Sequence, residues 1–117
     1  MSTTPAKQDF TIYLGGTWSK SFTVNEDWTG RTVYMQARYA NNDASPITGW
    51  DLSSPSAGIV LTPGASSSTF VITVAYADVL NLTGTAEFDI MTDDGSGVRD
   101  YYLQGKLIPD RRTTQVA

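Results

Sequence analysis

The sequence of 117 residues contains no cysteine and no histidine. Without cysteine the chain has no disulfide framework and no thiolate metal site. Without histidine it lacks the commonest general base near neutral pH and the commonest metal ligand. A serine or cysteine nucleophile activated by histidine is therefore excluded. A serine–lysine pair stays formally open, but the three lysines, Lys7, Lys20 and Lys106, lie in no recognisable motif. We expect no enzyme activity, no catalytic residue, no metal site and no cofactor.

Charge is also scarce, since charged residues make up 17% of the chain and the formal net charge is -4. A mildly acidic chain without a basic run is a poor candidate for binding nucleic acid, where Lys and Arg must neutralise phosphates. The sequence lacks the polybasic patch that attracts anionic membranes and the roughly 20 consecutive apolar residues that a spanning helix needs. No signal peptide is visible at the N-terminus. We expect neither nucleic acid nor a membrane as a partner.

What the chain does contain is alternation of polar and apolar residues. The alternation is strictest over residues 32–39, where the face carrying Val33 and Met35 is expected to be the core face. The same pattern predicts further strands over residues 9–14, 17–24, 58–62, 68–74, 85–92 and 98–108, with a short edge strand near 47–52. Residues 76–82 instead have helical spacing, which predicts one helical turn.

Turn-forming residues separate most of these segments, about every ten residues. This spacing is typical of an antiparallel β-sandwich. We therefore expect an all-β, Ig-like sandwich of about seven strands over residues 9–109, with a flexible N-terminal arm (1–8) and a C-terminal tail (110–117). The first two strands flank Gly15 and Gly16, and either form a hairpin or are one strand that changes sheets at the glycines. Gly105 within the last strand indicates a bulge or a close approach of another backbone segment.

Two groups of carboxylates are candidates for chemistry. Glu87 and Asp89 share a strand face, as the paired carboxylates of a glycosidase could. Asp93, Asp94 and Asp100 flank a glycine-rich loop and could offer oxygens to calcium. A solvated strand face and an ordinary polar hairpin explain these two groups more simply.

Aromatic residues are more informative about function. Tyr34 shares its strand face with Arg38, and Tyr101 and Tyr102 point to opposite faces, so one of those two is expected to be exposed. Exposed aromatics near arginine are typical of protein interfaces. The candidate interface residues are Tyr34, Arg38, Trp50, Tyr101, Arg111 and Arg112.

Three segments resemble small structural proteins of tailed bacteriophages. Residues 27–38 (DWTGRTVYMQAR) resemble that family's "DLTG-x-T, then apolar-x-Met-Gln-x-Arg" segment, with Trp28 where the family usually has Leu. Residues 16–23 (GTWSKSFT) are similar to its "G-D/T-T-aromatic-S-x-x-F" opening. Residues 86–90 and 103–107 (AEFDI and LQGKL) are similar to its "Y-D-L … L-x-G-x-apolar" closing hairpin. The resemblance covers residues 9–109.

The resemblance implies an Ig-like β-sandwich, similar to the N-terminal domain of baseplate upper proteins, with no catalytic residues. It implies a virion protein, assembled in the host cytoplasm, that attaches neighbours such as portal, tail, baseplate or fibre proteins in the tail, baseplate or neck. We expect a symmetric homo-oligomer whose ends, residues 1–8 and 109–117, order on assembly. The alternatives are a head decoration protein on the capsid, or a carbohydrate-binding module with a row of exposed aromatics.

Overall fold

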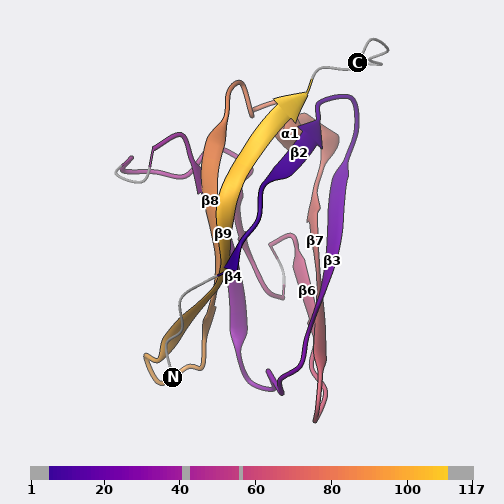
Figure 1. Cartoon of the computed structure of the whole chain (residues 1–117), viewed down its shortest axis with the longest axis vertical. Helices are drawn as coiled ribbons and strands as arrows, with labels where there is room; N and C mark the ends of the chain where they lie inside the picture. The colour runs from indigo at the N-terminus through magenta and orange to yellow at the C-terminus, as the bar shows by residue number, and fades with distance from the viewer. Residues whose placement is uncertain (1–5, 41–42, 56, 111–117) are drawn as a thin grey trace.

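The computed structural model describes residues 6–40, 43–55 and 57–110. Within them lie nine strands and one short helix, and the expected all-β sandwich is confirmed (Figure 1). The elements are β1 (Ala6–Lys7), β2 (Phe10–Tyr13), β3 (Trp18–Val24), β4 (Thr32–Arg38), β5 (Asp51–Ser53), β6 (Ile59–Thr62), β7 (Ser68–Val74), α1 (Tyr76–Val79), β8 (Ala86–Asp93) and β9 (Arg99–Asp110). The seven main strands expected from the sequence are β2, β3, β4, β6, β7, β8 and β9, and β5 lies close to the short edge strand expected near 47–52. Only β1, which is two residues long, was not predicted.

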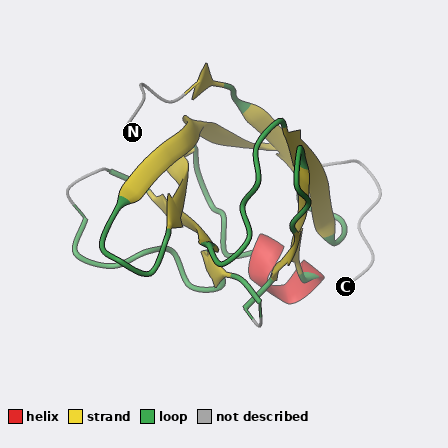
Figure 2. Cartoon of the chain, turned by 90° about the horizontal axis from the view of Figure 1, so that it is seen from below, coloured by secondary structure: helices red, strands yellow, loops and turns green. Residues whose placement is uncertain are grey.

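The strands form two sheets that face each other. The larger sheet has the order β1-β9-β8-β4-β5, with β2 also beside β9, and the smaller sheet has the order β3-β7-β6. Figure 2 looks along the long axis of the molecule and shows the two layers opposite each other, with the helix beside the smaller one. Pairing is antiparallel except that β1 and β2 run parallel to β9, which the expectation of a purely antiparallel sandwich did not include.

The first two long strands belong to different sheets. β2 pairs with β9 in the larger sheet, whereas β3 pairs with β7 in the smaller one. Of the two arrangements left open by the sequence, the strand that changes sheets at Gly15 and Gly16 is therefore the observed one. This crossing closes the sandwich at the end where β9 finishes (Figure 1).

The core lies between the sheets and is filled by the inward residues of each strand. Val33 and Met35 are fully buried, as the alternation predicts. Phe70, at the centre of the smaller sheet, stacks on Phe22 at 4.9 Å and on Trp28 at 5.5 Å between ring centroids. Each large apolar side chain buried in this way contributes roughly 1.5–3 kcal/mol. Packing across the sheets is therefore the main source of stability.

Trp50 also belongs to the core. Its side chain is 0% exposed, and its indole N–H donates a 3.0 Å hydrogen bond to the backbone oxygen of Asp78 in α1. The prediction that Trp50 is an interface residue is wrong, because an aromatic side chain at the end of a loop, directly before β5, can turn inward as easily as outward. Its indole instead anchors the α1 segment to the core. α1 confirms the predicted helical turn but is shorter than residues 76–82.

The N-terminal segment is part of the larger sheet. Ala6 and Lys7 pair with β9, and the amide N–H of Gln8 donates to the oxygen of Gln104 at 2.9 Å. A Cβ on Gly105 would collide with the backbone oxygen of Gln8, so the close approach predicted at this glycine is confirmed. The arm predicted over residues 1–8 therefore wrongly includes residues 6–8, which lie against β9. Residues 1–5 lie outside the described part of the chain. Among the described residues no helix is long and apolar enough to cross a membrane.

Candidate functional site

A row of large side chains crosses the outer face of the larger sheet. Tyr34 on β4 pairs with Met91 on β8, and Met91 pairs with Tyr101 on β9, so the three side chains lie side by side on one face. Tyr101 is 43% exposed, and Tyr34 and Met91 are half-buried. Three adjacent large side chains give this charged sheet face an apolar centre.

Polar residues flank this row on one side and are held by hydrogen bonds. The guanidinium of Arg38 donates to Gln36 Oε1 at 2.7 Å and to the backbone oxygen of Asp43 at 3.2 Å. The amide of Gln36 in turn donates to Asp51 Oδ1 at 2.9 Å. Because both ends of this chain of bonds are anchored, Arg38 is held in position beside the apolar row.

Together these side chains surround a shallow hollow of about 400 Å³, which we call the outer-face hollow. Its lining residues are Tyr34, Gln36, Arg38, Asp89, Met91, Arg99 and Tyr101. Burial raises the pKa of the Asp89 carboxyl above its ordinary value, and the positive charge of Arg38 partly offsets this. A carboxylate kept where its charge is disfavoured is more frequent at binding sites than elsewhere, although structural ion pairs show it too.

Three of the six predicted interface residues meet at this hollow, namely Tyr34, Arg38 and Tyr101. Trp50 is in the core, and Arg111 and Arg112 lie outside the described residues. The sequence reasoning missed Met91. Its alternation with Glu87 and Asp89 placed it on the outer face, but its position between two tyrosines depends on strand register. A bulge between Ile90 and Met91 shifts that register, and alternation does not reveal it.

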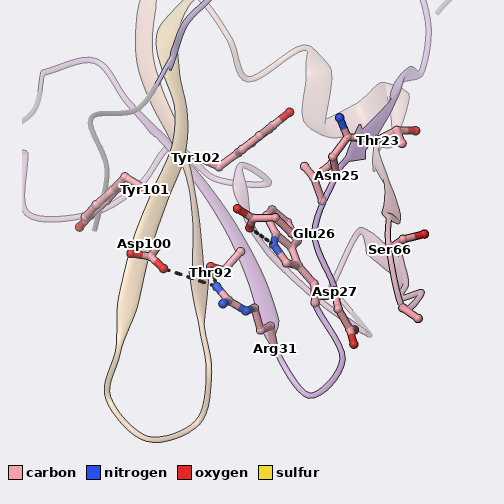
Figure 3. A pocket seen from close by; sticks show the side chains of 13 residues that line it. Thr23, Asn25, Glu26, Asp27, Arg31, Ser66, Thr92, Asp100, Tyr101 and Tyr102 are labelled. Carbon is pink, nitrogen blue, oxygen red and sulfur yellow. Dashed lines mark hydrogen bonds and ion pairs between the residues drawn. The ribbon is translucent and has the colours of Figure 1, made fainter. Parts of the chain in front are cut away.

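A second and larger cavity, of about 810 Å³, opens at the end of the sandwich opposite the end of β9 (Figure 3). We call it the end pocket. It lies between the loop from β3 to β4, the loop from β6 to β7 and the first residues of β9. Tyr102 projects from β9 toward Asn25 at the end of β3. The lining residues are Thr23, Val24, Asn25, Glu26, Asp27, Trp28, Arg31, Ala65, Ser66, Thr92, Asp100, Tyr101 and Tyr102.

One buried serine holds the two loops together. Ser68 is 1% exposed, and its hydroxyl donates to the backbone oxygen of Glu26 at 2.8 Å. The hydroxyl oxygen of Ser68 in turn accepts the backbone N–H of Trp28 at 2.9 Å and that of Gly64 at 3.4 Å. Because these partners come from both loops, Ser68 sets the width of the pocket at this side.

The pocket contains charged groups of both signs. Arg31 Nη1 lies 3.5 Å from Asp100 Oδ2 and donates to the hydroxyl of Thr92 at 3.2 Å. Glu26 Oε1 accepts the indole N–H of Trp28 at 2.9 Å. Hydrogen bonds from the hydroxyl and the amide of Thr29 lower the pKa of the Asp27 carboxyl, so Asp27 is ionised at neutral pH.

The carboxylates considered for calcium are arranged differently. Asp93 and Asp94 accept backbone N–H bonds within their own hairpin, from Gly95 and from Ser96 respectively. The bond from Gly95, together with the side chain of Arg99, lowers the pKa of Asp93. Asp100 points to the other side of β9, toward Arg31. In the part of the chain that the structure describes, no three acidic residues form a group that could hold a metal ion.

Fold and surface thus define an all-β sandwich with two candidate binding surfaces. No model of a known protein family matches the sequence, and a search of curated proteins found no match either.

Proposed function

We propose that this chain is a non-catalytic structural protein of a tailed-bacteriophage particle that binds a neighbouring virion protein through the outer-face hollow. The observation that carries the binding role is the row Tyr34–Met91–Tyr101 with Arg38 held beside it. Tyrosine, methionine and arginine are enriched at protein interfaces, and an apolar centre with a polar rim is their usual anatomy. The virion role is supported by the resemblance of residues 9–109, and by a sequence that lacks both histidine and cysteine.

On this proposal the chain assembles in the host cytoplasm as a symmetric homo-oligomer. It occupies the tail, the baseplate or the neck, where it attaches portal, tail, baseplate or fibre proteins. Closed symmetric assemblies are the commonest form of homo-oligomer. A place on the capsid as a head decoration protein is the alternative within the same class.

The genes that flank this one test the class. Flanking genes for portal, tail or fibre proteins support the virion role, whereas flanking genes for metabolic enzymes contradict it. The products of the flanking genes are then purified and tested for binding to this chain by surface plasmon resonance.

The binding surface is tested with Tyr34→Ala/Tyr101→Ala, which removes both aromatic side chains of the row. Loss of two central aromatics is expected to weaken binding by tenfold or more, as about 2 kcal/mol at a hot spot implies. The matched control is Val60→Ser, because Val60 is 61% exposed on the outer face of the smaller sheet. Equal binding by the double variant and by the control would contradict the assignment of the hollow.

Carbohydrate binding is a second candidate, because the same hollow combines two tyrosines with the side chains of Arg38, Asp89 and Gln36. Stacking on aromatic rings together with fixed hydrogen-bonding groups is the chemistry that a sugar requires. Affinity electrophoresis in gels that contain polysaccharides separates the two. Retardation that is lost in Tyr34→Ala/Tyr101→Ala would favour sugar binding over protein attachment.

A further inference from the structure

The end pocket has an excess of negative charge. Its lining contains the carboxylates of Glu26, Asp27 and Asp100 against the single guanidinium of Arg31, which is three negative charges against one positive, a formal balance of -2. The one ion pair among them is loose, since 3.5 Å is longer than the 2.7–2.9 Å usual for a charged N–H···O bond. The lining therefore attracts a cation.

Asp100 retains unused capacity to accept a hydrogen bond. Its Oδ1 is buried and has no hydrogen-bond partner among the described residues. A buried acceptor without a partner costs free energy, and a cation held close to this carboxylate would offset part of that cost through its charge.

The walls of the pocket are partly aromatic. Tyr102 is half-buried and meets Trp28 edge to face at 5.7 Å between ring centroids, and both residues line the pocket. Carboxylates next to aromatic rings suit a guanidinium better than an ammonium, because the planar group bonds carboxylates in pairs and stacks on rings. The chemistry of the pocket thus selects arginine.

The sequence places two arginines directly after β9. Arg111 and Arg112 follow Asp110, the last residue of that strand. They cannot reach the end pocket of their own chain. Asp100 and Asp110 lie ten residues apart on one extended strand, which separates them by about 30 Å. Two further residues span at most about 7 Å. An arginine from this segment can enter an end pocket only on another copy.

We propose that the end pocket binds Arg111 and Arg112 of a second copy of this chain, so that copies join head to tail. Each copy accepts at the end of the sandwich that carries the pocket and donates at the opposite end, where β9 finishes (Figure 1). Such a contact is heterologous, and its repetition yields a ring where the rotation closes and a filament where it does not. The inference concerns a second surface, and it goes beyond the attachment proposed for the outer-face hollow.

Sedimentation velocity of the full chain over a range of concentrations tests the inference. The donor variant, Arg111→Ala/Arg112→Ala, removes both cations. The pocket variant, Glu26→Gln/Asp27→Asn, neutralises two carboxylates but keeps the oxygens that accept from Trp28 and Thr29. We expect the unchanged chain to self-associate and each variant to associate roughly tenfold more weakly, as the loss of two partly exposed ion pairs implies. Added salt is expected to weaken association of the unchanged chain in the same direction.

Mixing the two variants gives the sharpest result. The donor variant keeps its pocket and the pocket variant keeps its arginines, so an equimolar mixture is expected to form a one-to-one dimer and nothing larger. A control with the same charge change, Asp9→Asn/Glu87→Gln, alters residues that line neither the end pocket nor the outer-face hollow, and it is expected to associate as the unchanged chain does. Circular dichroism of each variant confirms that it is folded.

Three results would overturn the inference. The unchanged chain remains monomeric at its highest soluble concentration, the folded variants associate as strongly as the control, or their mixture contains no one-to-one dimer. Self-association of Tyr34→Ala/Tyr101→Ala at the level of the unchanged chain is expected, and it separates this proposal from the one for the outer-face hollow. If only the outer-face variant lost association, the contact would run through the hollow and the head-to-tail inference would be wrong.

Discussion

Replacing Ser68 by alanine is expected to weaken the fold at the end pocket. The substitution removes one hydroxyl that serves three backbone groups, of which the N–H of Trp28 and the oxygen of Glu26 form the two shortest bonds, at 2.9 Å and 2.8 Å. Alanine cannot replace either bond, and a buried backbone group left without a partner costs about 1–3 kcal/mol. Because Ser68 is 1% exposed, we expect a loss near the middle of that range, about 2 kcal/mol.

Urea unfolding followed by tryptophan fluorescence measures this loss. The midpoint is expected to fall with an unchanged slope, since the surface exposed on unfolding stays the same. In a thermal scan about 2 kcal/mol corresponds to a decrease in Tm of roughly 8 °C for a domain of this size. The control is Ser21→Ala, because Ser21 is exposed on β3 and its substitution should change stability by less than about 0.5 kcal/mol. If both variants were equally stable, the assignment of Ser68 as the link between the loops would be refuted.

Three further outcomes are expected. Trp50→Phe removes the indole donor to the backbone oxygen of Asp78, which keeps the N–H of Asn81, and it places a smaller ring in the core. It should cost about 1–3 kcal/mol in urea unfolding, whereas a surface position for Trp50 would cost nothing measurable. Gly105→Ala places a Cβ against the backbone oxygen of Gln8, so amide hydrogen exchange at Gln8 should accelerate, and unchanged protection would contradict the observed contact. Asp89→Asn should raise Tm at pH 7. The pKa of Asp89 is higher in the folded state than in the unfolded state. The protonated carboxyl therefore favours folding at a pH below the unfolded-state pKa, and this stabilisation is lost as the pH rises through the folded-state pKa. The gain should disappear below about pH 3, and a gain that persists there would contradict this cause.

The outer-face hollow was only partly predictable. Alternation along β4 correctly placed Tyr34 on the outer face, and along β9 it required one of Tyr101 and Tyr102 to be exposed, because side-chain direction in a strand is a local property with a period of two residues. In the structure Tyr101 is the exposed one, so Tyr34 and Tyr101 are the pair on the outer face. That the two residues flank Met91 depends on how β9 is aligned with β8, including the bulge at Ile90 and Met91. Alignment between strands distant in sequence depends on long-range packing, which no local pattern encodes.

By itself, the sequence determined the positions of the seven strands of four residues or more, the buried face of β4, and that histidine and cysteine chemistry is absent. It also predicted a single sandwich domain over residues 9–109. Only the tertiary structure decided that β2 and β3 lie in different sheets, that Trp50 turns inward, and that the loops bound by Ser68 enclose an acidic pocket. The physical reason is that strand formation depends on neighbours along the chain, whereas sheet membership and cavities depend on contacts between residues far apart in it.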